Sequence, residues 1–160
     1  MYPNKKIIDK KFRNLIIVSY LALIFQIVYG AFVAGLKAGL LHNHWPFMNE
    51  GKFMHETVYI LEPFYKNLIE NPSGIQFIHR TFAYVVVVFI LIIWYQGKKM
   101  SLTKLQNKAL DALFILVFVQ FLLGVLTIIY QVPLWLGVAH QVGAFFLLSA
   151  MTFTLHRFCK

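Results

Sequence analysis

The sequence is poor in charge and in cysteine. Only 13% of its 160 residues are charged and only six are acidic, whereas 59% are hydrophobic. Soluble domains average about 25% charged and roughly 45–50% apolar residues, so this composition argues against a soluble fold. The single cysteine, Cys159, excludes an internal disulfide and a cysteine-based metal site.

The shortage of acidic residues leaves a net charge of +9, from 15 Lys and Arg against 6 Asp and Glu. A nucleic-acid-binding domain gathers its basic residues on a water-facing surface. Here they stand in short blocks between apolar runs. The expected partner is therefore a lipid bilayer and not nucleic acid.

Four long apolar runs occupy about residues 15–36, 75–95, 109–130 and 134–156. Each is long enough to cross a bilayer, which takes about 20 residues of helix. The first is longer than the apolar core of a signal peptide, about 7–15 residues, and no small-residue cleavage site follows it, so we expect it to be retained. We predict an all-α integral membrane protein in which residues 1–160 form one domain, a four-transmembrane-helix bundle.

Basic residues lie unequally on the two sides of these runs. Most of the 15 precede the first run, separate the second from the third or follow the fourth: Lys5, Lys6, Lys10, Lys11, Arg13, Lys98, Lys99, Lys104, Lys108, Arg157 and Lys160. Cytoplasmic loops carry such an excess of Lys and Arg. We therefore expect both termini in the cytoplasm and residues 37–74 in an outer loop, with its aromatic rings at headgroup depth.

The two halves of the chain resemble each other. FQIVYGAFVAG in the first run and VQFLLGVLTII in the third share a glutamine followed four residues later by a glycine: Gln26 and Gly30, Gln120 and Gly124. The runs that follow them, with QFIHRTFAY and GVAHQVGAF, each carry a histidine. This pattern predicts two repeated helical hairpins, the first with the long outer loop and the second with a tight turn at 131–133.

Histidines inside apolar spans are candidate site residues, because polar groups there are costly and usually face the bundle interior. His79 and His140 lie about 6 and 9 Å inside the outer ends of the second and fourth spans, at 1.5 Å per residue. Neither span holds a carboxylate or thiolate, which argues against zinc or di-iron. Two neutral imidazoles are good axial ligands for haem iron. The alternative is a hydrogen-bonded pair that ligates nothing.

Small residues surround His140. Gly137, Gly143 and Ala144 share its helix face and would admit a flat ligand. The same small residues could instead only bring helices together, as small-xxx-small stripes commonly do. Gly30 begins a similar stripe on the first span.

Arg80, directly after His79, is the one charge well inside a predicted span. It either snorkels to the outer surface or meets an anion such as a haem propionate, for which Lys37 is a weaker candidate. Gln76, one turn before His79, can form hydrogen bonds but cannot accept a proton at neutral pH. The other histidines are expected to be exposed, interfacial or remote from the pair: His42, His44, His55 and His156.

Three blocks together resemble the heme A synthase family of cytochrome oxidase assembly proteins: AGLKAGLLHNHWPFM, NLIENPSGIQFIHRTFAY and QFLLGVLTIIYQVPLWLGVAHQVGAFFLLSA. The resemblance implies a four-helix bundle that binds haem b between its second and fourth helices, with His79 and His140 matching the axial ligands. It further implies oxidation of the C8 methyl of heme O to the formyl group of heme A, which requires oxygen and electrons.

This chain departs from the family in two ways. Typical members are about twice as long, with two fused bundles, and this chain resembles the C-terminal one. The N-terminal bundle carries a glutamate three residues before its first histidine and often a cysteine pair in an outer loop; here Gln76 stands at that position and the loop has no cysteine. The resemblance thus implies a half that passes electrons through bis-histidine haem b. Activity would need a homo-oligomer or a complementary N-terminal-half chain, and heme O synthase is a further candidate partner.

Two readings of the function stay open. One is all or part of heme A synthase, and the other is a catalytically silent electron-transfer or assembly module, which Gln76 favours. A small transporter is disfavoured, because no span is broken by proline or paired glycines. The bacterial plasma membrane is favoured over the mitochondrial inner membrane, because no Arg- and Ser-rich leader is seen.

Overall fold

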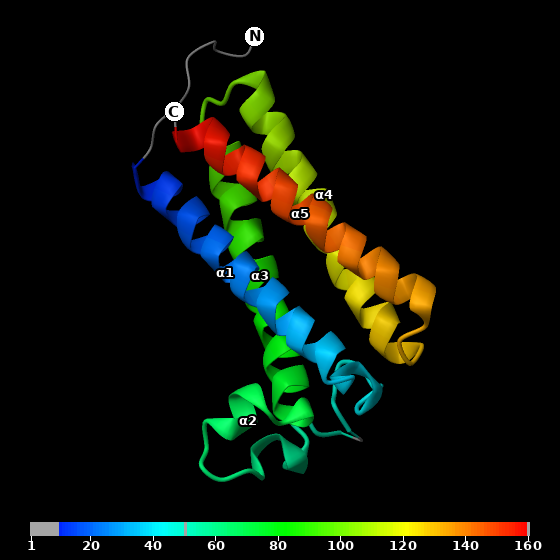
Figure 1. Ribbon diagram of the computed structural model, residues 1–160. Helices are drawn as coiled ribbons and strands as arrows, with labels where there is room; N and C mark the ends of the chain where they lie inside the picture. Colours follow the sequence, from blue (N-terminus) through cyan, green and yellow to red (C-terminus); the bar gives the residue numbers. More distant parts are fainter. Residues whose placement is uncertain (1–9, 50, 160) are drawn as a thin grey trace.

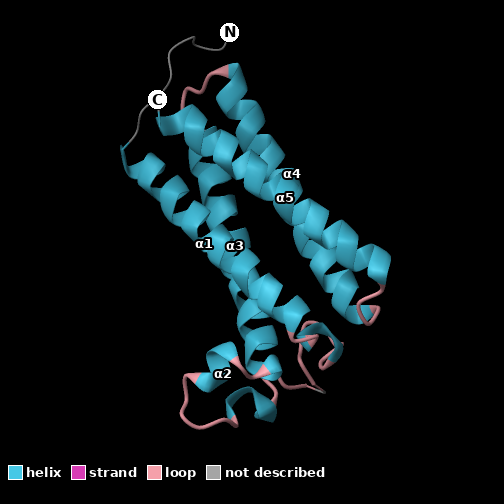
Figure 2. Ribbon diagram, in the orientation of Figure 1, coloured by secondary structure: helices cyan, strands magenta, loops and turns pink. Residues whose placement is uncertain are grey.

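Four long helices make up most of the protein. The structure is a computed structural model that describes residues 10–49 and 51–159, so Lys5, Lys6 and Lys160 of the predicted cytoplasmic charges lie outside the described residues. The long helices are α1 (Lys10–Gly35), α3 (Pro72–Lys98), α4 (Lys104–Ile129) and α5 (Leu134–Cys159). They run as two adjacent hairpins, with helix α1 packed on α3 and α4 on α5 (Figures 1 and 2).

The prediction of four long apolar helices is confirmed. Each is long and apolar enough to cross a membrane. Helices α3 and α4 begin earlier than the predicted apolar runs because polar residues cap them. Thr103 Oγ1 accepts a hydrogen bond from Gln106 N at 3.2 Å while Gln106 Oε1 accepts one from Thr103 N at 3.0 Å, a capping box that starts α4. Asn71 caps α3, whose first residue is Pro72.

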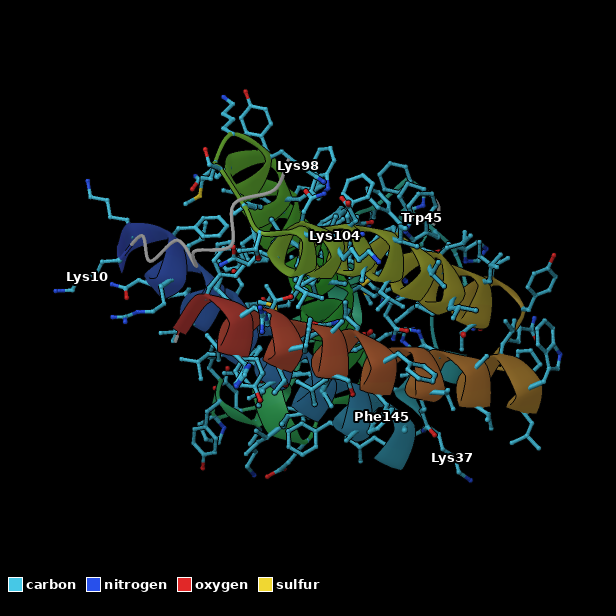
Figure 3. All side chains as sticks on the ribbon, turned by 90° about the horizontal axis from the view of Figure 1, so that it is seen from above. Lys10, Lys37, Trp45, Lys98, Lys104 and Phe145 are labelled. Carbon is cyan, nitrogen blue, oxygen red and sulfur yellow. The ribbon has the colours of Figure 1, made fainter. Side chains whose placement is uncertain are left out.

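The start of α1, the end of α5 and the α3–α4 connection lie at one end of the bundle, and the long connection between α1 and α3 lies at the other (Figure 1). Lys10 and Lys37 mark opposite ends of α1 in Figure 3. The basic residues counted above as cytoplasmic, where described, therefore share the end that holds the start of α1 and the end of α5.

The outer loop was predicted over residues 37–74, of which 72–74 belong to α3. The connection between α1 and α3, residues 36–49 and 51–71, is called the outer segment after that prediction and contains short ordered pieces: η1 (Ala38–Leu40), η2 (Glu56–Tyr59) and α2 (Lys66–Ile69). The buried amide of Asn67 joins α2 to the residues after η2, accepting from Ile60 N and Leu61 N at 3.0 Å each and donating to Leu61 O at 2.7 Å. Asn43 joins this segment to the second hairpin by donating to Ile128 O at 3.0 Å. The aromatic side chains of the outer segment are exposed: Trp45, Phe47, Phe53, Tyr59, Phe64 and Tyr65.

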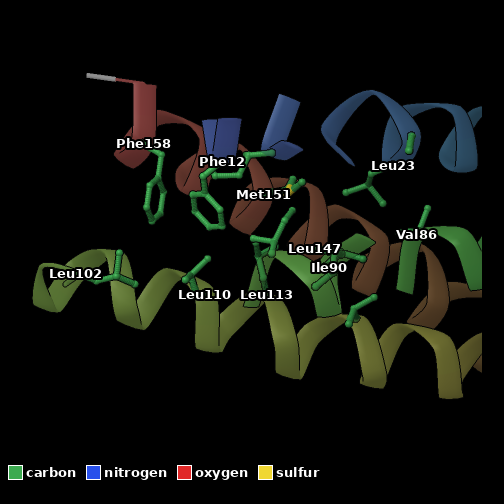
Figure 4. Packing of buried hydrophobic residues seen from close by; sticks show 14 residues of the cluster. Phe12, Leu23, Val86, Ile90, Leu102, Leu110, Leu113, Leu147, Met151 and Phe158 are labelled. Atoms are coloured by element: carbon green, nitrogen blue, oxygen red, sulfur yellow. The ribbon is translucent and has the colours of Figure 1, made fainter. Parts of the chain in front are cut away.

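The apolar core occupies the half of the bundle nearest the termini. All four long helices contribute to it, among others with Phe12, Ile90, Leu113 and Met151 (Figure 4). In the other half the hairpins diverge (Figure 1). In this half, each long helix has a stretch without a buried residue: 24–35 in α1, 77–85 in α3, 118–126 in α4 and 137–146 in α5. The core therefore holds the hairpins together at one end only, and both candidate histidines lie outside it.

Candidate functional site

His79 projects from α3 against the first helix of its hairpin. A Cβ atom added to Gly30 would lie 3.1 Å from Cε1 of the imidazole, so only glycine admits the ring without displacement. One turn earlier on α1, Gln26 Nε2 donates to the backbone oxygen of His79 at 3.0 Å and lies 3.5 Å from its Nε2. Nδ1 of His79 is buried and has no hydrogen-bond partner among the described residues.

His140 has the same surroundings in the second hairpin. A Cβ atom on Gly124 would lie 2.9 Å from Cε1 of the ring. Gln120 Nε2 donates to the backbone oxygen of His140 at 2.9 Å and lies 3.1 Å from Nδ1. Each hairpin thus holds one imidazole against a glycine of the neighbouring helix, beside a glutamine amide one turn away.

His79 and His140 belong to different hairpins, and each imidazole lies against a glycine of the other long helix of its own hairpin. Within the described residues, no group of three or more His, Cys, Asp or Glu side chains could hold a metal ion. Two imidazoles alone could hold a metal only where its other ligands are supplied by a macrocycle.

The small residues near His140 have different neighbours. A Cβ atom on Gly143 would collide with Oε1 of Gln120, so this glycine makes room for the amide. A Cβ atom on Gly137 would meet nothing within 4 Å. Ala144 is half-buried.

Arg80 reaches into the outer segment. Its guanidinium donates to four backbone carbonyls: His42 O at 3.3 Å, His44 O at 2.7 Å, Pro46 O at 3.3 Å and Phe47 O at 3.1 Å. The positive charge is thus held at the outer end of α3 by carbonyl dipoles. Lys37, in a left-handed turn after α1, is exposed.

Gln76 is buried at the junction of α3 with the outer segment. Its Nε2 donates to His42 O at 3.1 Å, and its Oε1 has no partner among the described residues. The amide therefore fastens the outer segment to the helix that carries His79.

A chain of hydrogen bonds between the outer segment and the start of α3 was not predicted from the sequence. Nε2 of His42, the hydroxyls of Ser73 and Thr57, and Nδ1 of His55 are linked in that order at 2.8 Å each. The two imidazoles pack against each other with centroids 4.4 Å apart and planes tilted by 35°. Burial, followed by the nearby charges of His55 and Arg80, lowers the pKa of His42 from 6.5 to about 4. His44 and His156 are exposed.

Comparison with known proteins decides the family. The COX15-CtaA family, described as cytochrome oxidase assembly protein, matches residues 3–152. The chain belongs to this family. The match includes both glutamine–histidine pairs, Gln26 with His79 and Gln120 with His140.

The similar curated proteins are named heme A synthase. That of Flavobacterium johnsoniae is 54% identical over 163 residues, covering 100% of this chain and 48% of that protein. That of Flavobacterium psychrophilum is 50% identical over 161 residues, again covering 100% and 48%. That of Nitrosospira multiformis is 37% identical over 136 residues, covering 84% and 38%. The chain spans about half the length of its Flavobacterium relatives. No solved structure matches it significantly.

Proposed function

We propose that this chain binds haem b between its two hairpins and serves in heme A biosynthesis, as all or part of heme A synthase. The single observation that carries the proposal is the matched pair of sites in which a glutamine and a glycine hold an imidazole, one in each hairpin. The same match supports two repeated hairpins as the origin of the bundle.

The residues fit the group. His79 and His140 would hold the haem iron, and the helices around them contribute no buried residue over 77–85 and 137–146. Gly137 leaves open space where a side chain would stand, whereas the space at Gly143 is taken by the amide of Gln120 and Ala144 is half-buried. Arg80 would hold a propionate beside the carbonyls that it already contacts. Gln76 would fix the outer segment above the group.

A haem with two imidazole ligands supplies one-electron transfer and leaves no open position for oxygen. The protein's part is to hold the rings, to shield them with apolar helices and to keep Arg80 at the outer end. Conversion of the heme O methyl group to the formyl group of heme A would then take place in a second unit. Because the chain spans about half the length of its Flavobacterium relatives, that unit would be a second four-helix unit, in this or another chain, with heme O synthase as a candidate supplier.

The second candidate is a catalytically silent electron-transfer or assembly module. Gln76 favours it, because an amide cannot accept a proton and this one is already committed to a backbone carbonyl. Supplying heme O to cells that express only this chain separates the two. Heme A formed by the isolated chain contradicts the silent module.

We also propose that the termini face the cytoplasm, in a bacterial plasma membrane. The proposal rests on the basic residues that share the end of the bundle with the start of α1 and the end of α5. Cysteine labelling with an impermeant reagent tests it in a chain that carries C159S: the exposed position 37 in K37C reacts in intact cells, whereas position 104 in K104C reacts only after lysis.

The haem assignment is tested by H79A and H140A in protein purified with haem. Each substitution removes one imidazole, so we expect loss of the low-spin bis-imidazole spectrum in both. H156A, an exposed histidine on α5 outside the site, serves as the matched control. An unchanged low-spin spectrum in both site variants refutes the ligand assignment.

A further inference from the structure

Two glutamines contact the backbone and the ring of the candidate ligands. The amides of Gln26 and Gln120 each donate to the backbone oxygen of a histidine, and they lie beside different ring nitrogens, Nε2 of His79 and Nδ1 of His140. The Oε1 atom of each is buried and has no hydrogen-bond partner among the described residues. Leaving a buried amide oxygen without a hydrogen bond is costly. Because this unpaired oxygen occurs at both sites, we expect each of them to have a donor partner when the site is in use.

An iron-bound histidine supplies that partner. When one ring nitrogen bonds to a metal, the proton resides on the other nitrogen, and that N–H requires an acceptor. A glutamine carries a donor and an acceptor on the same carbon. By rotating its amide, the glutamine can exchange the hydrogen bond that its Nε2 donates to the histidine backbone oxygen for one that its Oε1 accepts from the N–H of a ligated ring.

The space for these amides is built into the helices. Oε1 of Gln120 lies against Gly143, where any side chain would collide with it. Gly124 and Gly30, one turn from the glutamines, leave the facing edge of each ring free. The glycines thus fix where ring and amide meet, which simple close packing of the helices would not require.

We propose that Gln26 and Gln120 are positioning residues that orient the imidazoles of His79 and His140 and, by accepting the ring N–H, lower the reduction potential of the bound haem. This deepens the proposed function and rests on it. An acceptor on the ring N–H increases the basicity of the ligand, which stabilises ferric iron. Gln120 contributes more than Gln26, because its amide lies 3.1 Å from the ring nitrogen against 3.5 Å.

The test compares four variants of the haem-loaded chain. Q120M and Q26M keep the size of the side chain and remove the acceptor, whereas Q120E keeps an oxygen at the same place. Q106M is the matched control, since Gln106 is a buried glutamine on the same helix that caps its start and contacts Arg157 O, away from the site. The midpoint potential and the electron paramagnetic resonance spectrum are measured for each.

We expect Q120M to shift the equilibrium toward reduced iron by roughly threefold to tenfold, tenfold being about 59 mV, and to change the low-spin g values. We expect Q26M to shift the equilibrium toward reduced iron by less than Q120M, and Q120E not to shift it toward reduced iron. Haem affinity falls by about 10- to 100-fold in Q120M, as for other residues that orient a metal ligand.

The outcomes separate the two proposals. A wild-type chain without a low-spin spectrum overturns both. A wild-type chain with that spectrum, but with Q120M and Q106M equal in potential and g values, overturns the role of the glutamines and leaves the haem assignment standing. Equal shifts in Q120M and Q120E overturn it as well, because the acceptor oxygen would then be irrelevant.

Discussion

Gly124→Ala should weaken haem binding without unfolding the chain. The added methyl carbon would lie 2.9 Å from Cε1, 3.5 Å from Nε2 and 3.6 Å from Nδ1 of His140. In the free protein the ring can move aside, and alanine gains about 0.8–1.0 kcal/mol over glycine in a helix. In the haem-loaded protein the iron would fix the ring, so the overpacking cost of about 1–3 kcal/mol would weaken haem binding by that amount.

That cost corresponds to about a 5- to 150-fold loss of haem affinity. The assay is titration of the apoprotein in detergent with haem, followed by absorbance. G35A is the matched control, because nothing lies within 4 Å of a Cβ atom at that position on α1. G30A should fall between them, since its contact with the other histidine is longer at 3.1 Å. Equal haem affinities for G124A and G35A would refute the reasoning.

Three further predictions concern the outer segment and the start of α4. Arg80→Leu removes donors to four carbonyls and should destabilise residues 42–47 by about 1–3 kcal/mol, seen as faster proteolysis there; an unchanged cleavage rate contradicts it. The pKa of His42 is lowered from 6.5 to about 4, so the neutral hydrogen-bond chain is fully stable above pH 6.5 and weakens as the pH falls toward 4, with an NMR titration midpoint near 4 as the check. A midpoint of 6.5 in the folded protein would contradict it. Thr103→Ala loses a capping box and should lower the free energy of unfolding by about 1 kcal/mol in a denaturant titration, with the haem spectrum unchanged.

Much of the candidate site could be read from the sequence because its parts recur at fixed spacing. The glutamine and glycine four residues apart on α1 and on α4, and one histidine in each following span, were visible as a repeat. The contact between them was not. Whether Gln26 faces His79 depends on the rotation of α1 about its own axis and on the angle at which it crosses α3. Neither can be predicted from the hydropathy of the sequence.

The outer segment was the least predictable part. Its fold depends on Asn67, whose amide joins Ile60 and Leu61 before it to Asn71 after it. It also depends on Arg80, which is paired with carbonyls and not with a carboxylate. The contact between the rings of His42 and His55 brings together residues that no local pattern connects. Such contacts form only when distant parts of the chain come together in the fold, and no periodic pattern in the sequence indicates them.

The sequence by itself determined the four helices and their apolar character, because helix formation in a bilayer depends on local runs of apolar residues whose backbone groups must pair within the segment. It also determined the two candidate histidines, since polar groups are conspicuous in such runs. Only the tertiary structure decided that the core lies at one end of the bundle, that the hairpins diverge at the other, and that an unpaired amide oxygen lies beside each glutamine–histidine contact. These features depend on how side chains from different helices interlock, which is a property of the whole packing and not of any segment.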